Sequence, residues 1–244
     1  MIHDLSQIRA IIKRDLFLNR DLFDKQLEVL TKNFKSNLSK SKIFETLFKY
    51  SLEQLKNLTI GYVIKKKPRS KRKSFSLFYL DLEQIFKNQS EDYYPDRIPI
   101  SWRHFDSKNL DRHKAELTVC YIATHCIERV LRRSNAQNLK DSLLILNPTI
   151  NVLIALAQIF IHVQERHKYI LYWQQGYLVL EVKEHSFIIL TWMPKDWFSN
   201  NQHLRFYNFQ GDSFYLFDDA TINSKGVLSL TDALLVIPPT CLWS

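Results

Sequence analysis

The spacing of apolar residues changes along this chain of 244 residues, and that change constrains its fold more than any other feature. Over residues 8–58 apolar side chains recur every three or four positions, which predicts two or three amphipathic helices. Residues 58–64 and 75–80 are rich in β-branched and aromatic types and predict two strands. Together the two periods predict an α+β fold that begins with a helical N-terminal module and a basic β-hairpin.

Seven cationic side chains crowd into residues 65–73, between those two predicted strands. Like charges at this density repel one another and cannot be buried, so we expect an exposed hairpin tip or loop. Such a segment neutralises phosphate groups without reading their sequence. We therefore predict nucleic-acid contact by Lys65, Lys66, Lys67, Arg69, Lys71, Arg72 and Lys73.

The net charge of +9 is concentrated in one half of the chain. Residues 1–114 carry 24 basic and 14 acidic side chains, whereas residues 115–244 carry 10 and 11. So uneven a field favours a polyanionic partner, nucleic acid first and an anionic membrane surface second. The most apolar run, residues 150–163, has about 14 residues, fewer than the roughly 20 that span a bilayer. We interpret that run as a buried helix and expect no membrane partner.

Residues 88–112 are polar, contain two prolines and show neither period, so we predict an irregular connection there. The connection separates a basic helical and hairpin module, residues 1–87, from a helix-plus-antiparallel-sheet domain, residues 113–244. Thr124 is the expected N-cap of a helix, and Pro148 fits a first helical position.

The second part alternates between helical and strand patterns. The predicted helices are 124–133, 138–146 and 148–165; the predicted strands are 169–173, 177–182 and 187–192, a hairpin of 206–209 with 214–217, and a last short helix or strand at 229–236.

Residue counts exclude several classes of protein. Three cysteines, Cys120, Cys126 and Cys241, are an odd number, and no signal sequence opens the chain, so we expect a reducing, cytoplasmic location. Four glycines are too few for a phosphate-binding loop, which argues against kinases, nucleotide-driven motors and dinucleotide enzymes.

The predicted helix over residues 124–133 carries the residues with the most chemistry. At helical spacing His125 and Arg129 are side by side, Arg132 lies one turn further on, and Glu128 shares their solvated face. Guanidinium groups disfavour the charged imidazolium, which leaves His125 available as a base, and the arginines offer forks for phosphate oxygens. This combination suits RNA cleavage without a metal or other cofactor, in which a base takes the proton of the 2′-hydroxyl. The alternative from the residue pattern is that His125 and Glu128 only pair with arginines on a solvated helix face.

Residues 121–133, YIATHCIERVLRR, resemble the opening helix of the toxin-like nucleases of the barnase, colicin D and RelE superfold. The resemblance covers about residues 117–198 and implies that helices precede a curved antiparallel sheet. It also implies that a hydroxyl residue of a late strand, here Thr191 as a hydrogen-bond donor, joins His125, Arg129 and Arg132 in the catalytic site. A toxin-like endoribonuclease would act on RNA in preference to DNA, and a neutralising acidic protein would be its partner.

Three other interpretations stay open at this point. Glu181 and Lys183 lie on one face of a predicted strand, as in magnesium-dependent nucleases, but the preceding strand has no acidic residue. His162, Glu165 and His167 lack the spacing of a metal site, so we predict no metal. A non-catalytic nucleic-acid-binding accessory or assembly factor of a plasmid, phage or mobile element would need only the basic module.

Overall fold

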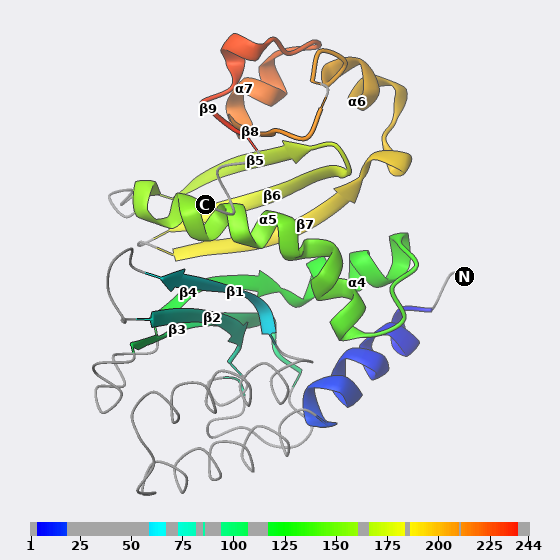
Figure 1. Ribbon diagram of the computed structural model, residues 1–244. Helices are drawn as coiled ribbons and strands as arrows, with labels where there is room; N and C mark the ends of the chain where they lie inside the picture. The colour runs from blue at the N-terminus through cyan, green and yellow to red at the C-terminus, as the bar shows by residue number, and fades with distance from the viewer. Residues whose placement is uncertain are drawn as a thin grey trace, which may run out of the picture.

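The computed structural model describes residues 4–18, 59–66, 73–81, 85, 94–106, 117–160, 166–183, 186–209 and 211–238. These residues form an α+β structure, as predicted (Figure 1). A helix over residues 5–18 opens the chain. The further elements are β1 (Thr59–Lys66), β2 (Lys73–Leu80), β3 (Arg97–Asp106), β4 (Leu117–Ala123), α4 (Thr124–Arg133), α5 (Leu139–Phe160), β5 (His167–Trp173), β6 (Gly176–Lys183), β7 (Ser186–Pro194), η1 (Lys195–Trp197), α6 (Asn200–Arg205), β8 (Phe214–Asp218), α7 (Asp219–Ser224), η2 (Leu230–Asp232) and β9 (Leu235–Ile237).

Within the described residues, nine strands form one sheet in the order β1-β2-β3-β4-β7-β6-β5-β8-β9. Neighbouring strands are antiparallel except β4 and β7, which run parallel. The expected antiparallel sheet is therefore wrong in this respect, and the sheet is mixed. The reason is that α4 and α5 follow β4, so the chain crosses over before it returns as β5, β6 and β7.

The predicted irregular connection, residues 88–112, contains β3, so that prediction is wrong for residues 97–106. Ile98 and Ile100 are fully buried and alternate with Pro99 and Ser101, a strand pattern that the proline obscured. Because β3 pairs with β2 on one side and β4 on the other, the sheet continues across the predicted domain boundary. Residues 107–116 lie outside the described residues.

Two strands lie where the basic hairpin was predicted. β1 and β2 are antiparallel, with Lys66 opposite Lys73. Residues 67–72 lie outside the described residues, and the basic loop stays a prediction. The N-terminal helical module is described only over residues 5–18.

The chain from residue 139 to 160 forms one helix, α5, where two were predicted. Pro148 lies inside it and not at a first helical position. The Thr149 hydroxyl donates to the carbonyl oxygen of Leu146 at 2.6 Å, and buried side chains on both sides of the proline hold the helix on the sheet. Packing thus overrides the helix-breaking tendency of proline.

The predicted strands 169–173, 177–182 and 187–192 are confirmed as β5, β6 and β7. The predicted hairpin of 206–209 with 214–217 is wrong, because residues 206–208 are a turn after α6. β8 pairs instead with β5 and β9.

Buried apolar residues form two clusters among the described residues, one on each face of β5 and β8. Strand alternation explains this division, since Leu171 and Trp173 join the larger cluster while Ile170 and Tyr172 join the smaller. The larger cluster continues through α4, α5 and the helix over residues 5–18, which ties both halves of the sheet into one core.

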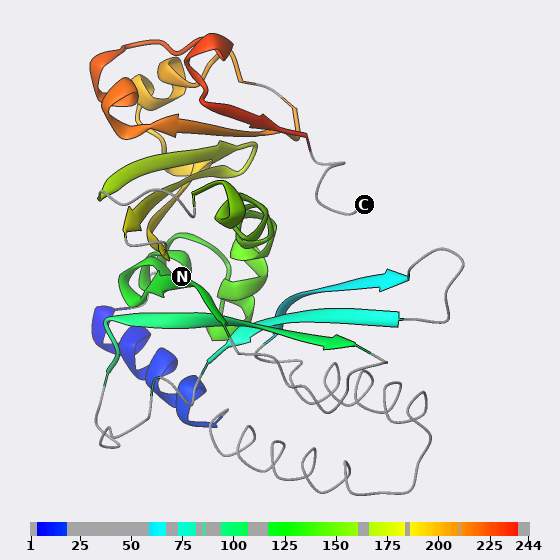
Figure 2. The same cartoon turned by 90° about the vertical axis from the view of Figure 1, so that its left-hand side faces the viewer.

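The helix over residues 5–18 lies beside α4 in both ribbon views (Figures 1 and 2). It buries Ile8, Ile12 and Leu16 in the larger core. Its Asp15 carboxylate accepts a hydrogen bond from the backbone N–H of Leu139 at 2.9 Å, which satisfies the first turn of α5. The N-terminal helix is therefore part of the domain that carries α4 and α5.

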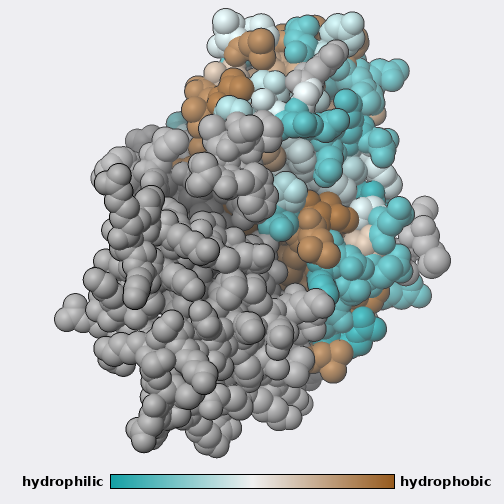
Figure 3. All heavy atoms as spheres, viewed as in Figure 1, coloured by the Kyte–Doolittle hydropathy of each residue, from teal (hydrophilic) through white to brown (hydrophobic). Residues whose placement is uncertain are grey.

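The surface seen in Figure 3 is mostly hydrophilic over the described residues, with hydrophobic side chains gathered in two places, one at the level of α5 and one near β9 and α7. Val227, Leu230, Leu234 and Val236 are exposed in the second of these. No helix in the described part of the chain is both long and apolar enough to cross a membrane.

Candidate active site

Helix α4 packs beside the second half of β7. β4 pairs with β7 from Cys120, opposite Phe187, to Ile122, opposite Ile189. The chain then turns into α4, so a helix lies beside β7 where a strand would continue. Arg133 on α4 donates to the carbonyl oxygen of Trp192 at 3.2 Å, an oxygen on this edge of β7. The arrangement brings the polar side of α4 against the strand.

Helix α4 begins one residue earlier than predicted, because Thr124 was expected as the N-cap. The N-cap is Ala123, and Thr124 is the first helical residue. Its backbone N–H donates to the carbonyl oxygen of Asp96 at 2.9 Å, and its hydroxyl donates to that of Pro95. The segment before β3 thus fixes the start of the helix.

A β-bulge turns Thr191 toward α4. Val179 pairs with Thr191 but Leu180 pairs with Ile189, so Leu190 is an extra residue on β7. Without the bulge Thr191 would share the face of Ile189, which is buried in the larger core. With it, Thr191 accepts a 2.6 Å hydrogen bond from Nη1 of Arg129 through Oγ1.

His125, Arg129 and Arg132 line one pocket of about 260 Å³ together with Leu5, Glu128, Arg133 and Trp197; we call it the arginine pocket. The side chain of His125 is 59% exposed, so its ring is accessible to a ligand. The structure therefore brings three of the four predicted catalytic residues to one pocket. It joins the fourth, Thr191, to them through Arg129.

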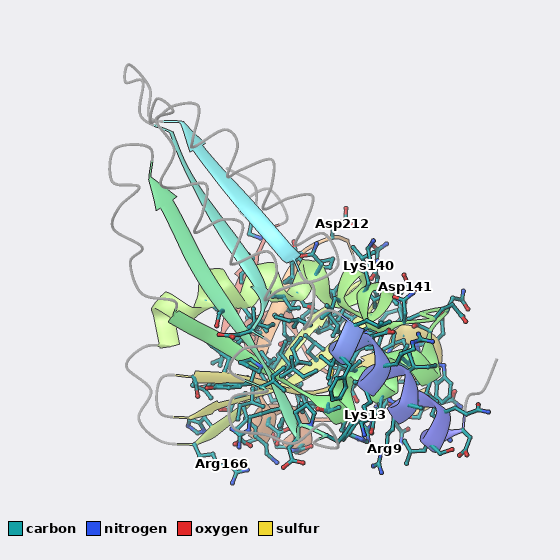
Figure 4. The ribbon with its side chains drawn as sticks, turned by 90° about the horizontal axis from the view of Figure 1, so that it is seen from below. Arg9, Lys13, Lys140, Asp141, Arg166 and Asp212 are labelled. Atoms are coloured by element: carbon teal, nitrogen blue, oxygen red, sulfur yellow. The ribbon has the colours of Figure 1, made fainter. Side chains whose placement is uncertain are left out.

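Glu128 contradicts the expectation of a solvated helix face, because its side chain is only 7% exposed. Arg9 Nε donates to Oε1 at 2.9 Å, and the Tyr94 hydroxyl donates to the same oxygen at 3.0 Å. The other oxygen, Oε2, lies 3.3 Å from Nδ1 of His125. These partners lie 119 and 34 residues away in sequence, so helical spacing alone could not reveal the burial. Arg9 and Lys13 project from the N-terminal helix on this side (Figure 4).

The partners of Glu128 keep its carboxylate ionised. Burial raises the pKa of Glu128, but hydrogen bonds from Arg9, Tyr94 and His125 outweigh it and hold the pKa below its usual value. Burial, with the Glu128 charge, raises the pKa of Tyr94, which therefore stays a neutral donor. An ionised Glu128 can accept a hydrogen bond from Nδ1–H of His125, and in that neutral tautomer Nε2 carries the lone pair.

Arg133 is a further cationic residue of the arginine pocket, and it was not among the predicted catalytic residues. Burial first, and then the charges of Arg129 and Arg132, lower its pKa. Its guanidinium carbon lies 5.2 Å from the ring centroid of Trp197, and its Nη1 also contacts Sδ of Met193 at 3.3 Å. Three guanidinium groups this close repel one another, and a bound anion would relieve that repulsion.

The other sequence candidates are not brought together. Glu181 is buried and paired with Arg166 at 2.8 Å, and the side chain of Lys183 is not described. No group of three His, Cys, Asp or Glu side chains that could hold a metal occurs in the described ranges, which omit His162 and Glu165.

The predicted nucleic-acid-binding residues lie on and between two strands. Lys65 and Lys66 end β1 and Lys73 begins β2, whereas Lys67, Arg69, Lys71 and Arg72 lie outside the described residues. Cys120 and Cys126 are buried free thiols, and burial raises the pKa of each to about 12, so neither is a nucleophile.

No protein-family model matched the chain, and comparisons with curated proteins and with solved structures found no match. The geometry of the site is therefore the evidence from which a function can be proposed.

Proposed function

We propose that this protein is a metal-independent endoribonuclease with its active site in the arginine pocket. The observation that carries the proposal is the 2.6 Å hydrogen bond between Arg129 of α4 and Thr191 of β7, beside the exposed imidazole of His125. A group that can accept a proton, a cation that can bind phosphate and a hydroxyl therefore lie near one another at the surface. These are the groups that cleavage by the 2′-hydroxyl of RNA requires.

In the proposed reaction Nε2 of His125 takes the proton of the 2′-hydroxyl. The 2′-oxygen attacks the adjacent phosphorus, and the bond from phosphorus to the 5′-oxygen breaks. The departing oxygen takes a proton from water, and the hydroxide left behind takes the proton from the His125 imidazolium, which restores the neutral base. The products are a 2′,3′-cyclic phosphate and a 5′-hydroxyl.

Glu128 is a positioning residue in this reaction. Its carboxylate orients the imidazole through Nδ1 and stabilises the imidazolium that forms, while Arg9 and Tyr94 hold the carboxylate in place. Loss of the Glu128 charge should therefore move the acidic limb of the pH–rate profile to lower pH, because the imidazolium is then less stable.

Arg129 and Arg132 bind the phosphoryl oxygens on which charge gathers in the transition state. The bond to Thr191 fixes the Arg129 guanidinium, and the Thr191 hydroxyl retains its own hydrogen to donate to the substrate. We propose that the cationic segment over residues 65–73 adds affinity for RNA, and that an acidic protein covering the arginine pocket would neutralise the activity.

The test is cleavage of RNA by the purified full chain in EDTA. We expect the parent to cleave and His125→Ala to lose cleavage by about 100-fold or more while it still binds RNA, because removal of a general base has that effect. Arg132→Lys should also lose turnover, since a point charge cannot reproduce two-pronged phosphate binding.

Two results would overturn the proposal. Binding without cleavage under any metal condition would favour the non-catalytic accessory factor. Cleavage that appears only with Mg²⁺ would contradict a metal-independent reaction.

A further inference from the structure

A groove of about 870 Å³ adjoins the arginine pocket. Arg132, Arg133 and Trp197 line both hollows, so the two are adjacent. Gln174 and Gln175 of the β5–β6 turn and Lys195 of η1 add polar groups to the groove, and the backbone N–H of Lys195 donates to the carbonyl oxygen of Gln175 at 2.9 Å. The groove has no role in the proposed cleavage chemistry.

Trp197 is the residue of this groove whose exposure is least expected. Half of its surface is accessible, although large aromatic side chains are usually buried. The Arg133 guanidinium lies over one face of the ring, and Arg133 is itself held by the Trp192 carbonyl oxygen. The indole is thus supported on one face, and its exposed surface is available to a flat ligand.

We propose that Trp197 is a stacking platform for one nucleobase of single-stranded RNA, next to the phosphate bound in the arginine pocket. This inference rests on the proposed function and extends it to substrate recognition. A base that stacks on Trp197 would place its neighbouring phosphate within the range of Arg132 and Arg133, which line both hollows. Stacking on an aromatic ring beside cations is a general mode of single-strand binding.

The charge and polarity of the groove fit this ligand. Arg132, Arg133 and Lys195 outnumber Asp196, the acidic side chain among the lining residues that the structure describes. The carboxamides of Gln174 and Gln175 can both donate to and accept from a base edge. We expect the site to require an unpaired base, because a base within a duplex is stacked on its neighbours.

The experiment uses a fluorescent 2′-O-methyl RNA oligonucleotide, which cannot be cleaved because it has no free 2′-hydroxyl. Fluorescence anisotropy gives the Kd for the parent, Trp197→Ala and Trp197→Phe. The same proteins are measured with an abasic oligonucleotide of equal length. Tyr207→Ala removes an exposed aromatic ring outside the groove and is the matched control.

We expect Trp197→Ala to weaken binding of the base-containing oligonucleotide by about 5- to 150-fold, the range for loss of one stacked base. Trp197→Phe should bind nearly as the parent does, and binding of the abasic oligonucleotide should not change. Equal affinity of parent and Trp197→Ala, or an equal loss on both oligonucleotides, would overturn the stacking proposal. A stacking effect in a protein that leaves ordinary RNA intact would instead contradict the nuclease.

Discussion

Thr191 contributes a single hydroxyl to the site, and a local irregularity of the backbone directs it there. In a regular strand Thr191 would point with Ile189 into the larger core, but the extra residue Leu190 reverses its direction. The resemblance pointed to Thr191, and in the structure its hydroxyl accepts a hydrogen bond from Arg129. The sequence could not show how it reaches that neighbour, because a bulge depends on pairing with another strand.

Replacement of Thr191 tests this contact at the residue scale. Thr191→Val removes the acceptor of the Arg129 hydrogen bond at similar volume, and we expect kcat/KM for RNA to fall about 10- to 100-fold, since hydrogen bonds to charged groups contribute about 1.5–3 kcal/mol. Thr191→Ser keeps the hydroxyl and should retain most of the activity. Equal activity of the Val and Ser variants would show that the Arg129–Thr191 bond has no part in turnover.

At the scale of helices and strands, two segments far from α4 in the sequence pack against this helix and cover one of its polar side chains. The N-terminal helix provides Arg9 and the segment before β3 provides Tyr94, and together they bury Glu128. Helical periodicity predicted α4 and its two-faced character correctly. It could not predict that one polar residue of the exposed arc is covered, because the covering groups come from distant parts of the chain.

Glu128→Gln should make the stability of the protein less sensitive to acid. The folded-state pKa of Glu128 is depressed, so its stabilising contribution is present above the unfolded value near 4.5 and is lost as the pH falls through the folded value. We expect the variant to be about 1–3 kcal/mol less stable than the parent at pH 7, with a smaller difference at pH 3–4.

Urea unfolding at a series of pH values measures this effect, with the exposed Asp212→Asn as a control that should change stability little at any pH. A difference between parent and Glu128→Gln that stays constant from pH 7 to pH 3 would contradict the role assigned to the ionised carboxylate.

Asp15 lies on the N-terminal helix and should stabilise the first turn of α5. Its carboxylate accepts from the Leu139 backbone N–H, so Asp15→Ala leaves that donor without this partner. We expect a loss of about 0.5–2 kcal/mol in the free energy of unfolding, as for other capping carboxylates. Chemical denaturation measures it beside Asp196→Ala, an exposed carboxylate that should cost little. Equal stabilities of the two variants would argue against capping across helices.

At the scale of the whole molecule, the described strands form one sheet that joins segments of the basic half of the sequence to segments of the nearly neutral half. The strands β5, β6 and β7 were predictable from alternation, whereas the parallel pairing of β4 with β7 was not, since strand order depends on contacts far apart in sequence. That pairing places α4 beside β7 and so creates the candidate site. The residues of the candidate site could therefore be chosen from the sequence, whereas the strand pairing that brings them close together could not.

The salt dependence of RNA binding tests whether Arg132 contacts a phosphate group. If Arg132 contacts a phosphate, Arg132→Ala should reduce the slope of log K against log salt by about 0.7, the value for one contact with a single strand. Lys140→Ala, at the start of α5 and outside the arginine pocket, should leave the slope unchanged (Figure 4). Titrations of a 2′-O-methyl RNA between low and physiological salt give both slopes, and identical slopes would place Arg132 away from the phosphates.

The central claim is that His125 starts cleavage by removing the proton of the 2′-hydroxyl, and the ends of the RNA products report on it directly. In EDTA, mass spectrometry of the fragments should show 2′,3′-cyclic phosphate and 5′-hydroxyl ends for the parent, and about 100-fold or more less of these fragments for His125→Ala. Fragments with 5′-phosphate ends, or cyclic phosphate ends formed equally well by His125→Ala, would contradict it.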